Sequence, residues 1–155
     1  MTNTVWAWGH DSNCDSRKGT VHEMISFETF KPTDGTPIYL QILLYIKRGA
    51  VAGTIRDGDE LPSRRVLSAL LGINPNTVQK AFHMLEEDDL IESQTGAKSV
   101  MKLSEEKIVK LREDLLSEDI RSITESLRQM GISRDEALRL IAKFWEDTGT
   151  GTDID

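Results

Sequence analysis

The stretch that decides the fold is LPSRRVLSALLGINPNTVQKAFHMLEEDDLI, residues 61–91. It contains two apolar patterns with helical spacing, separated by a short break at Gly72. Ser63 is a favourable N-cap for the first helix, and Asn74 followed by Pro75 is a favourable start for the second. Two helices joined by so tight a turn form the helix-turn-helix pattern, in which the second helix enters the major groove of DNA.

Each of these two helices is expected to have a buried face and a polar face. In the first, the predicted buried stripe is Val66, Leu67, Leu70 and Leu71, and the outward residues are Arg64, Arg65 and Ser68. In the second, the predicted core face is Val78, Ala81, Phe82 and Leu85, and the opposite arc carries Asn76, Gln79, Lys80 and His83. Amides and cations are the groups that contact base edges and phosphates. An ordinary helical hairpin with a solvated polar face is the alternative.

The flanking segments complete a winged helix. Residues 25–31 alternate as in a short strand or extended arm, and Pro37 is expected to open a helix of about 37–52. After the second helix, short strand candidates at 90–93 and 99–102 surround a turn with Gly96 at its tip. A helix-turn-helix followed directly by a β-hairpin predicts a mainly α fold with a small hairpin, the winged helix-turn-helix.

From Ser104 onward the pattern is again helical. One apolar stripe is formed by Ile108, Leu111, Leu115, Ile120, Ile123, Leu127 and Met130. After a break at Gly131, the capping box Ser133–Glu136 opens a last helix with Ala137, Leu138, Ile141, Phe144 and Trp145. Two amphipathic helices are too few to bury both apolar faces, so we expect them to dimerise; packing back onto the winged helix is the alternative.

The resulting domain prediction has four parts. Residues 1–24 are expected to be a disordered extension, 25–103 the DNA-binding domain, 104–147 the helical dimerisation segment and 148–155 a disordered tail. The chain has 155 residues and a net charge of −7. Thirteen acidic and eight basic residues follow residue 103, a net −5, so the acidity lies mainly outside the DNA-binding domain and does not exclude DNA.

Other classes of protein are less well supported. Apolar runs stay below the ~18 residues of a membrane span, and the N-terminus lacks a signal-peptide pattern. The single cysteine fits a reducing cytoplasm. His10, Cys14 and His22 have no compact metal-ligand spacing, and a flexible extension is the simpler interpretation. Phosphate loops and a Ser/His/Asp set are absent from the sequence, so we expect neither an enzyme nor a cofactor.

The run PIYLQI…IKRGAVAGTIRDGDELPSRRVLSALLGINPNTVQKAFHMLEEDDLIE, together with the wing, resembles the winged-helix domain of the GntR family of bacterial transcription regulators, over about residues 34–102. Its element NPNTV-x-KA resembles the YtrA-type branch, whose members carry a short two-helix dimerisation segment. The resemblance implies DNA contacts by Arg65 near the start of the first helix of the pair and by Asn74, Asn76, Thr77 and Gln79 in the recognition helix. It also implies a wing contact at Gly96.

Three residues depart from the family pattern. Pro75 stands where many members have arginine, as is usual in the YtrA-type branch. The wing reads TGAKSVM, with Lys98 in place of a second glycine, so that Lys98 is expected to supply the wing's charge. Asp89 replaces the glycine that commonly ends the recognition helix, at a cost of about 0.5–1 kcal/mol if its backbone is left-handed.

The function expected is that of a homodimeric repressor on an inverted-repeat operator in double-stranded DNA. Ser63, Arg64 and Arg65 are expected beside a phosphate, Asn76 and Gln79 on adenine, and Lys80 on phosphate. The resemblance implies a transporter operon as target. A small-molecule effector is expected in the dimer cleft near Met130, Phe144 and Trp145, where dimer core is the alternative. A winged-helix adaptor that binds protein and no DNA is the rival interpretation.

Overall fold

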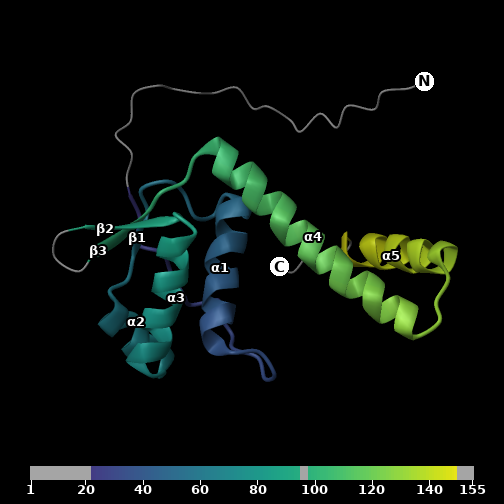
Figure 1. Ribbon diagram of the computed structural model, residues 1–155, viewed down its shortest axis with the longest axis horizontal. Coiled ribbons are helices and arrows are strands. Elements are labelled where there is room, and N and C mark those ends of the chain that lie inside the picture. The colour runs from purple at the N-terminus through teal and green to yellow at the C-terminus, as the bar shows by residue number, and fades with distance from the viewer. Residues whose placement is uncertain (1–21, 95–97, 150–155) are drawn as a thin grey trace, which may run out of the picture.

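The computed structural model describes residues 22–94 and 98–149, and within them it has five helices and one three-stranded antiparallel sheet (Figure 1). The elements are α1 (Ile38–Ala52), β1 (Glu60–Leu61), α2 (Arg64–Leu71), α3 (Pro75–Glu87), β2 (Ile91–Gln94), β3 (Lys98–Met101), α4 (Glu105–Gln129) and α5 (Arg134–Gly149). The predicted fold class, a winged helix-turn-helix followed by two helices, is confirmed.

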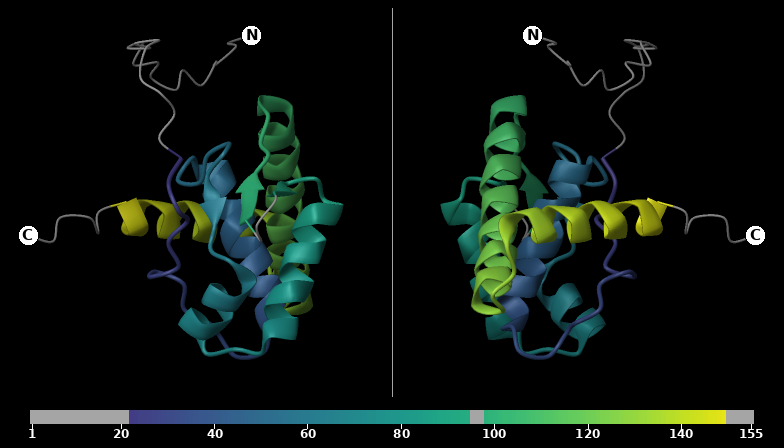
Figure 2. Two further views of the ribbon diagram at one scale, coloured as in Figure 1. Left: turned by 90° about the vertical axis from the view of Figure 1, so that its left-hand side faces the viewer. Right: turned by 90° about the vertical axis from the view of Figure 1, so that its right-hand side faces the viewer.

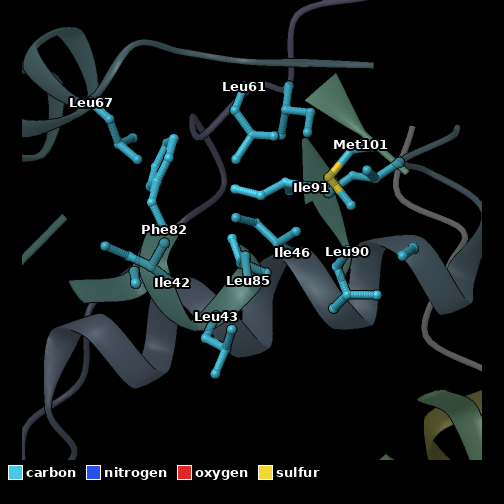
Figure 3. Close-up of a cluster of buried hydrophobic side chains, with 14 of the residues drawn as sticks. Ile42, Leu43, Ile46, Leu61, Leu67, Phe82, Leu85, Leu90, Ile91 and Met101 are labelled. Carbon is cyan, nitrogen blue, oxygen red and sulfur yellow. The ribbon is translucent and has the colours of Figure 1, made fainter. Parts of the chain in front are cut away.

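The core lies between the first three helices and the sheet. Helix α3 crosses in front of α1, and side chains from both helices point toward those of the strands (Figure 3). The largest completely buried side chains come from every one of these elements: Phe82, Ile42, Ile46, Leu67, Leu85, Met101 and Val78. The core face predicted for the recognition helix, Val78, Ala81, Phe82 and Leu85, is confirmed. This core fixes α3 with its polar face outward.

The sheet has the order β1-β3-β2, and its hairpin register pairs Ile91 with Met101 and Gln94 with Lys98. The predicted hairpin is therefore confirmed, with strand boundaries shifted by one residue. The third strand, β1, is only two residues long, so it has no periodicity that a sequence pattern would detect. The arm before α1 joins this edge, because Ile25 N–H donates to the Glu60 carbonyl at 2.9 Å. The turn at 95–97 lies outside the described residues.

Both predicted helix caps in the helix-turn-helix are confirmed. The Ser63 hydroxyl accepts from Val66 N–H at 3.2 Å, and the Asn74 side-chain oxygen accepts from Asn76 N–H at 2.8 Å. Pro75 is the first residue of α3, where its missing N–H costs no hydrogen bond. Pro37, by contrast, precedes α1 as its N-cap and is not its first helical residue, a difference of one position.

The buried face predicted for α2 is half right: Leu67 is buried and Leu71 packs against the core, whereas the other predicted residues lie outside. Val66 and Leu70 are 54% and 60% exposed, although they were expected inside. Ser68, expected outside, is 8% exposed, and its hydroxyl donates to the Ile73 carbonyl at 2.7 Å. The helix packs on Leu67 and Ser68 because the buried hydroxyl finds its acceptor in the turn that follows, so its burial leaves no unpaired polar group.

Helix α4 divides into a docked half and a projecting half. Its first turns lie on α1 through Ile108, Leu111 and Leu115, which belong to or pack against the hydrophobic core. The remainder runs away from the winged helix, and α5 turns back from its far end (Figures 1 and 2). The predicted cap of α5 is present, because Ser133 Oγ accepts from Glu136 N–H at 3.3 Å. Across the described residues, each helix is too short or too polar to cross a membrane.

Candidate nucleic-acid interface

The outward face of α3 carries two amide side chains that are free to bind a ligand. Asn76 and Gln79 are exposed and lie three residues apart, so they point to the same side of the helix. Within residues 22–94 and 98–149, neither side-chain amide has a hydrogen-bond partner in the protein. An amide offers a donor and an acceptor together, which is what the major-groove edge of adenine requires.

Two neighbouring residues have part of their hydrogen-bonding capacity occupied. The oxygen of Asn74 accepts the N–H of Asn76 as the helix cap, so its amide NH₂ group is what remains for a ligand. Thr77 is half-buried, and its backbone N–H donates to the Asn74 carbonyl at 2.9 Å. The first turn of α3 is thereby held rigid, and Asn76 is presented from a fixed backbone.

Lys80 is held in place by an aromatic ring that the sequence pattern did not indicate. Its ammonium lies over the ring of Tyr39, 3.8 Å from the centroid, a cation–π contact between α3 and the start of α1. Lys80 remains exposed, so the ring orients the charge without removing it from solvent. A local sequence pattern does not reveal this contact, because 41 positions separate Tyr39 from Lys80.

The two adjacent arginines at the start of α2 have different environments. Arg65 is exposed and, in the described part of the chain, has no ion pair or hydrogen bond through its side chain. Arg64 points inward: its guanidinium bonds Glu86 Oε1 at 3.1 Å and lies 5.1 Å from the Phe82 ring centroid. The expectation that Arg64 lies outside is wrong, because Glu86 on α3 and the Phe82 ring provide it with a half-buried site.

Glu86 connects the helix pair to the wing. Its Oε1 accepts both from Arg64 and from the Ser93 hydroxyl in β2, the latter at 2.5 Å. On the wing itself, Lys98 is exposed and its ammonium lies 3.1 Å from Glu60 Oε2 in β1. Such an exposed pair is weak and contributes about 0–1 kcal/mol, so it does not fix Lys98 to the protein. Gly96 lies outside the described residues.

The C-terminal helices carry an apolar surface at helical spacing. Three residues predicted for dimerisation, Ile108, Leu111 and Leu115, instead pack against the core of the same chain. The prediction that they form part of a dimer interface is therefore wrong. The remaining predicted residues are exposed or half-buried: Ile123, Leu127, Met130, Leu138, Ile141, Phe144 and Trp145. Exposed apolar residues absent from the prediction are Val109, Leu116 and Leu140.

Across the described ranges, the acidic, histidine and cysteine side chains form no group of three that would hold a metal ion. His10 and Cys14, two of the three candidates named from the sequence, lie outside those ranges. A cavity lies between the arm and α1, lined by Phe30, Tyr45 and Arg48 among others.

Comparison with known proteins identifies the family. Residues 38–100 match the model for bacterial regulatory proteins of the gntR family. A solved GntR family transcriptional regulator from Listeria monocytogenes is 30% identical, with a TM-score of 0.65, over 72% of this chain and 98% of that one. The chain belongs to the GntR family. It is accordingly a DNA-binding transcriptional regulator and not an enzyme.

Two HTH-type transcriptional regulators of Bacillus subtilis (strain 168) are similar in sequence. The uncharacterized HTH-type transcriptional regulator YhcF is 29% identical over 110 residues, which cover 71% of this chain and 91% of YhcF. The HTH-type transcriptional repressor YtrA is 43% identical over 65 residues, 42% of this chain and 50% of YtrA. The similarity to YtrA supports the YtrA-like kind of winged helix predicted from NPNTV-x-KA.

Proposed function

We propose that this GntR regulator is a homodimeric repressor that binds an inverted-repeat operator. The observation that carries the proposal is the set of three exposed side chains without partners in the described protein, Arg65, Asn76 and Gln79, which α2 and α3 present to solvent. A helix-turn-helix places its recognition helix in the major groove and the preceding helix across the backbone. The three side chains belong to the two helices that this geometry brings to DNA.

Base reading is assigned to the two amides. Asn76 and Gln79 each pair with adenine N6 and N7, and each good pair contributes about 1–3 kcal/mol of discrimination against the wrong base. Asn74 contributes its remaining NH₂ group, and Thr77 either contacts phosphate or bonds within the first helical turn. The rigid cap supports this role because a preorganised amide loses little rotational freedom on binding.

Phosphate binding is assigned to the cations around these amides. Arg65 and the free N–H groups near Ser63 at the start of α2 hold one phosphate, which the helix dipole also favours. Lys80, oriented by Tyr39, holds a second phosphate and carries no sequence information. Lys98 exchanges Glu60 for a phosphate beside the wing, where Gly96 is proposed to approach the minor groove.

Dimerisation is assigned to the projecting half of α4 together with α5. Leu116, Ile120, Ile123, Leu127 and Met130 follow one another at intervals of four, three, four and three residues, the spacing of a helix-pairing stripe. Since Leu111 and Leu115 are used inside the chain, we place the start of the pairing segment after Leu115 instead of at residue 104. A two-fold dimer then reads half-sites about 34–36 Å apart.

Repression and its regulation rest on similarity and on the exposed aromatic end of the dimer segment. YtrA of B. subtilis is named a repressor. A dimer bound across a promoter would repress by keeping RNA polymerase from that promoter. The resemblance to the YtrA-type branch favours a transporter operon as target and the cytoplasm as the site of action. A small-molecule effector is proposed to bind near Met130, Phe144 and Trp145 and to act by preferring one dimer state over another.

The adjacent arginines provide a test of the DNA-facing surface. We expect Arg65→Ala to weaken binding to every duplex and to flatten the slope of log affinity against log salt by about 0.9. The melting temperature of Arg65→Ala should equal that of the unmodified protein. Arg64→Ala should do the reverse: it leaves Glu86 without its cation and lowers the melting temperature, with the salt slope intact. Fluorescence anisotropy at five salt concentrations measures both slopes. Equal slopes for Arg65→Ala and the unmodified protein would exclude Arg65 from phosphate contact.

A further inference from the structure

A cluster of three charged side chains joins the end of the recognition helix to the start of α4. We call it the Asp89 cluster; its members are Asp89, Lys102 and Lys107. Asp89 Oδ1 lies 3.1 Å from the Lys102 ammonium, and Asp89 Oδ2 lies 2.7 Å from the Lys107 ammonium. Asp89 directly follows the cap of α3, Lys102 follows β3, and Lys107 lies in the first turn of α4.

On the side of α3, the cluster is built on a rigid helix end. Asp89 has φ +53°, and in the described residues it is the one non-glycine residue with a positive φ. Its N–H donates to the Glu86 carbonyl at 3.0 Å, and Leu90 N–H donates to the Leu85 carbonyl at 2.9 Å. These two bonds form a Schellman motif, with Leu85 and Leu90 both buried beneath it. The carboxylate of Asp89 therefore moves with the recognition helix.

On the side of α4, one ammonium group makes three contacts. Lys107 Nζ donates to Asp89 Oδ2, to the Asp89 carbonyl at 2.5 Å and to the Lys102 carbonyl at 3.3 Å. A lysine ammonium has three donors, so these acceptors use all of them. Lys107 is also more buried than the other two members, with 28% of its side chain exposed. Its position is thus specified in three directions from within the first turn of α4.

The other contacts made from within α4 are apolar or largely exposed. Leu111 and Leu115 pack on the core, but apolar contacts tolerate rotation and tilt better than hydrogen bonds do. Arg48 on α1 bonds both carboxylate oxygens of Asp119 at 3.2 Å, and both side chains are more than half exposed. An exposed pair of this kind is weak and is screened by salt. Just before α4, Leu103 N–H donates to Asp57 Oδ1 at 2.6 Å and holds the start of the helix, and Lys107 is the least exposed of the charged side chains that then hold its direction.

A small change of direction at this point has a large effect at the far end of α4. The helix extends about 33 Å from Lys107 to Gln129 at about 1.5 Å per residue. A tilt of about 10° at the start displaces the far end by about 6 Å, nearly two steps of about 3.4 Å along DNA. The apolar pairing stripe lies on this projecting half, so the tilt changes how far apart a dimer holds its two recognition helices.

We propose that the Asp89 cluster fixes the angle between the winged helix and α4 and thereby determines which spacing between operator half-sites the protein accepts. Asp89 and Lys107 are positioning residues in this role, since they act through α3 and α4 and contact no base. The inference rests on the proposed homodimer.

The cluster persists over the ordinary pH range. Hydrogen bonds from Lys107 and then Lys102 hold the pKa of Asp89 below its usual value, and Asp89 in turn raises the pKa of Lys102. A depressed carboxyl pKa means that the stabilisation is complete above the unfolded pKa and disappears as the pH falls through the folded one. Near neutral pH the cluster therefore acts as a constant part of the structure.

Two variants remove contacts of the Asp89 cluster while keeping the fold, and a third is their control. Lys107→Met keeps the aliphatic stem and removes the three contacts. Asp89→Gly removes the carboxylate and suits the left-handed backbone, so it does not strain the helix end. Lys110→Met is the matched control, because Lys110 is exposed on the next turn of α4 and its side chain makes no hydrogen bond or ion pair within the described residues.

Binding is measured on duplexes that carry the inverted repeat obtained by selection from a random-sequence pool. The half-sites stand at the spacing found by selection, or with one or two base pairs added or removed between them. We expect the unmodified protein and Lys110→Met to lose about tenfold or more in affinity at altered spacings, as for a mismatch worth about 1–3 kcal/mol. For Lys107→Met and Asp89→Gly, affinities should lie within about threefold of one another across the panel. Affinity for an isolated half-site should match that of the unmodified protein.

A second measurement reports on the angle without DNA. Spin labels are placed at His83→Cys and Gln129→Cys in a Cys14→Ser background, and labelled chains are diluted with unlabelled ones. We expect one narrow distance in the unmodified sequence and with Lys110→Met, and a broad distribution with Lys107→Met. An unchanged distribution would overturn the inference, as would a broad distribution with the spacing preference retained. An unmodified protein without any preference for paired sites would instead refute the proposed dimeric operator, and the inference with it.

Discussion

Sequence-specific binding should be lost when Asn76 and Gln79 are both replaced by alanine. Each amide is assigned about 1–3 kcal/mol of base discrimination, so the pair accounts for roughly 30-fold or more in affinity for the operator. Binding to a scrambled duplex should hardly change, because Arg65 and Lys80 still contact phosphate. Competition binding with the two duplexes at one salt concentration measures this ratio.

The control for this double variant is Gln129→Ala. Gln129 is also an exposed helical amide, but it lies at the far end of α4 and has no place in the proposed interface. Its replacement should leave both affinities as they are. An equal loss on operator and scrambled duplexes in Asn76→Ala/Gln79→Ala would show that the amides do not read bases.

Placing a charge on the pairing stripe should separate the protomers. Ile123 is 52% exposed in the single chain and lies in the middle of the stripe, so Ile123→Glu buries an unpaired carboxylate if two copies pair there. We expect a monomer in sedimentation equilibrium. Operator affinity should fall by about 10²–10⁴-fold, the advantage of binding two linked half-sites over one.

Arg121→Ala is the matched control for the pairing stripe. It changes the net charge by the same single unit but lies two positions before Ile123, on the side of α4 away from the stripe. It should remain a dimer with full operator affinity. A dimeric Ile123→Glu protein would contradict the assignment of the pairing surface, whereas a monomer that keeps full operator affinity would contradict the two-half-site model.

The recognition helix could be predicted closely from the sequence because its signals are local. Asn74 and Pro75 define its start, and the spacing of Val78, Phe82 and Leu85 defines its buried face. These features depend on residues within one or two turns of each other. Once the buried face of the helix is known, the residues on the opposite side follow from the helical repeat. This is why Asn76 and Gln79 could be predicted to be exposed.

The environment of α2 could not be predicted in the same way. A helix of eight residues has little periodicity, and its phase is decided by partners elsewhere: Glu86 for Arg64 and the Ile73 carbonyl for Ser68. The ring of Tyr39 beneath Lys80 is likewise distant in the chain. Such contacts exist only after the helices have packed, so a one-dimensional pattern does not contain them.

The docked half and the projecting half of α4 could not be told apart from the sequence. Leu111 and Ile123 belong to the same apolar pattern, yet the first is 8% and the second 52% exposed. What distinguishes them is the path of α4, which crosses the end of α1 and then runs away from the winged helix, so its far half covers no surface there (Figure 1). The periodicity predicts that both residues are buried, and tertiary packing decides against which partner.

The central claim is that two copies of the helix-turn-helix read a two-fold related site. Selection of bound duplexes from a random-sequence pool at low salt, followed by sequencing, tests it most directly. We predict enrichment of one inverted repeat whose half-sites are centred about one helical turn, 10–10.5 base pairs, or a small multiple of it apart. An unenriched pool, as expected for a protein-binding adaptor, or an enriched motif without two-fold symmetry would contradict the claim.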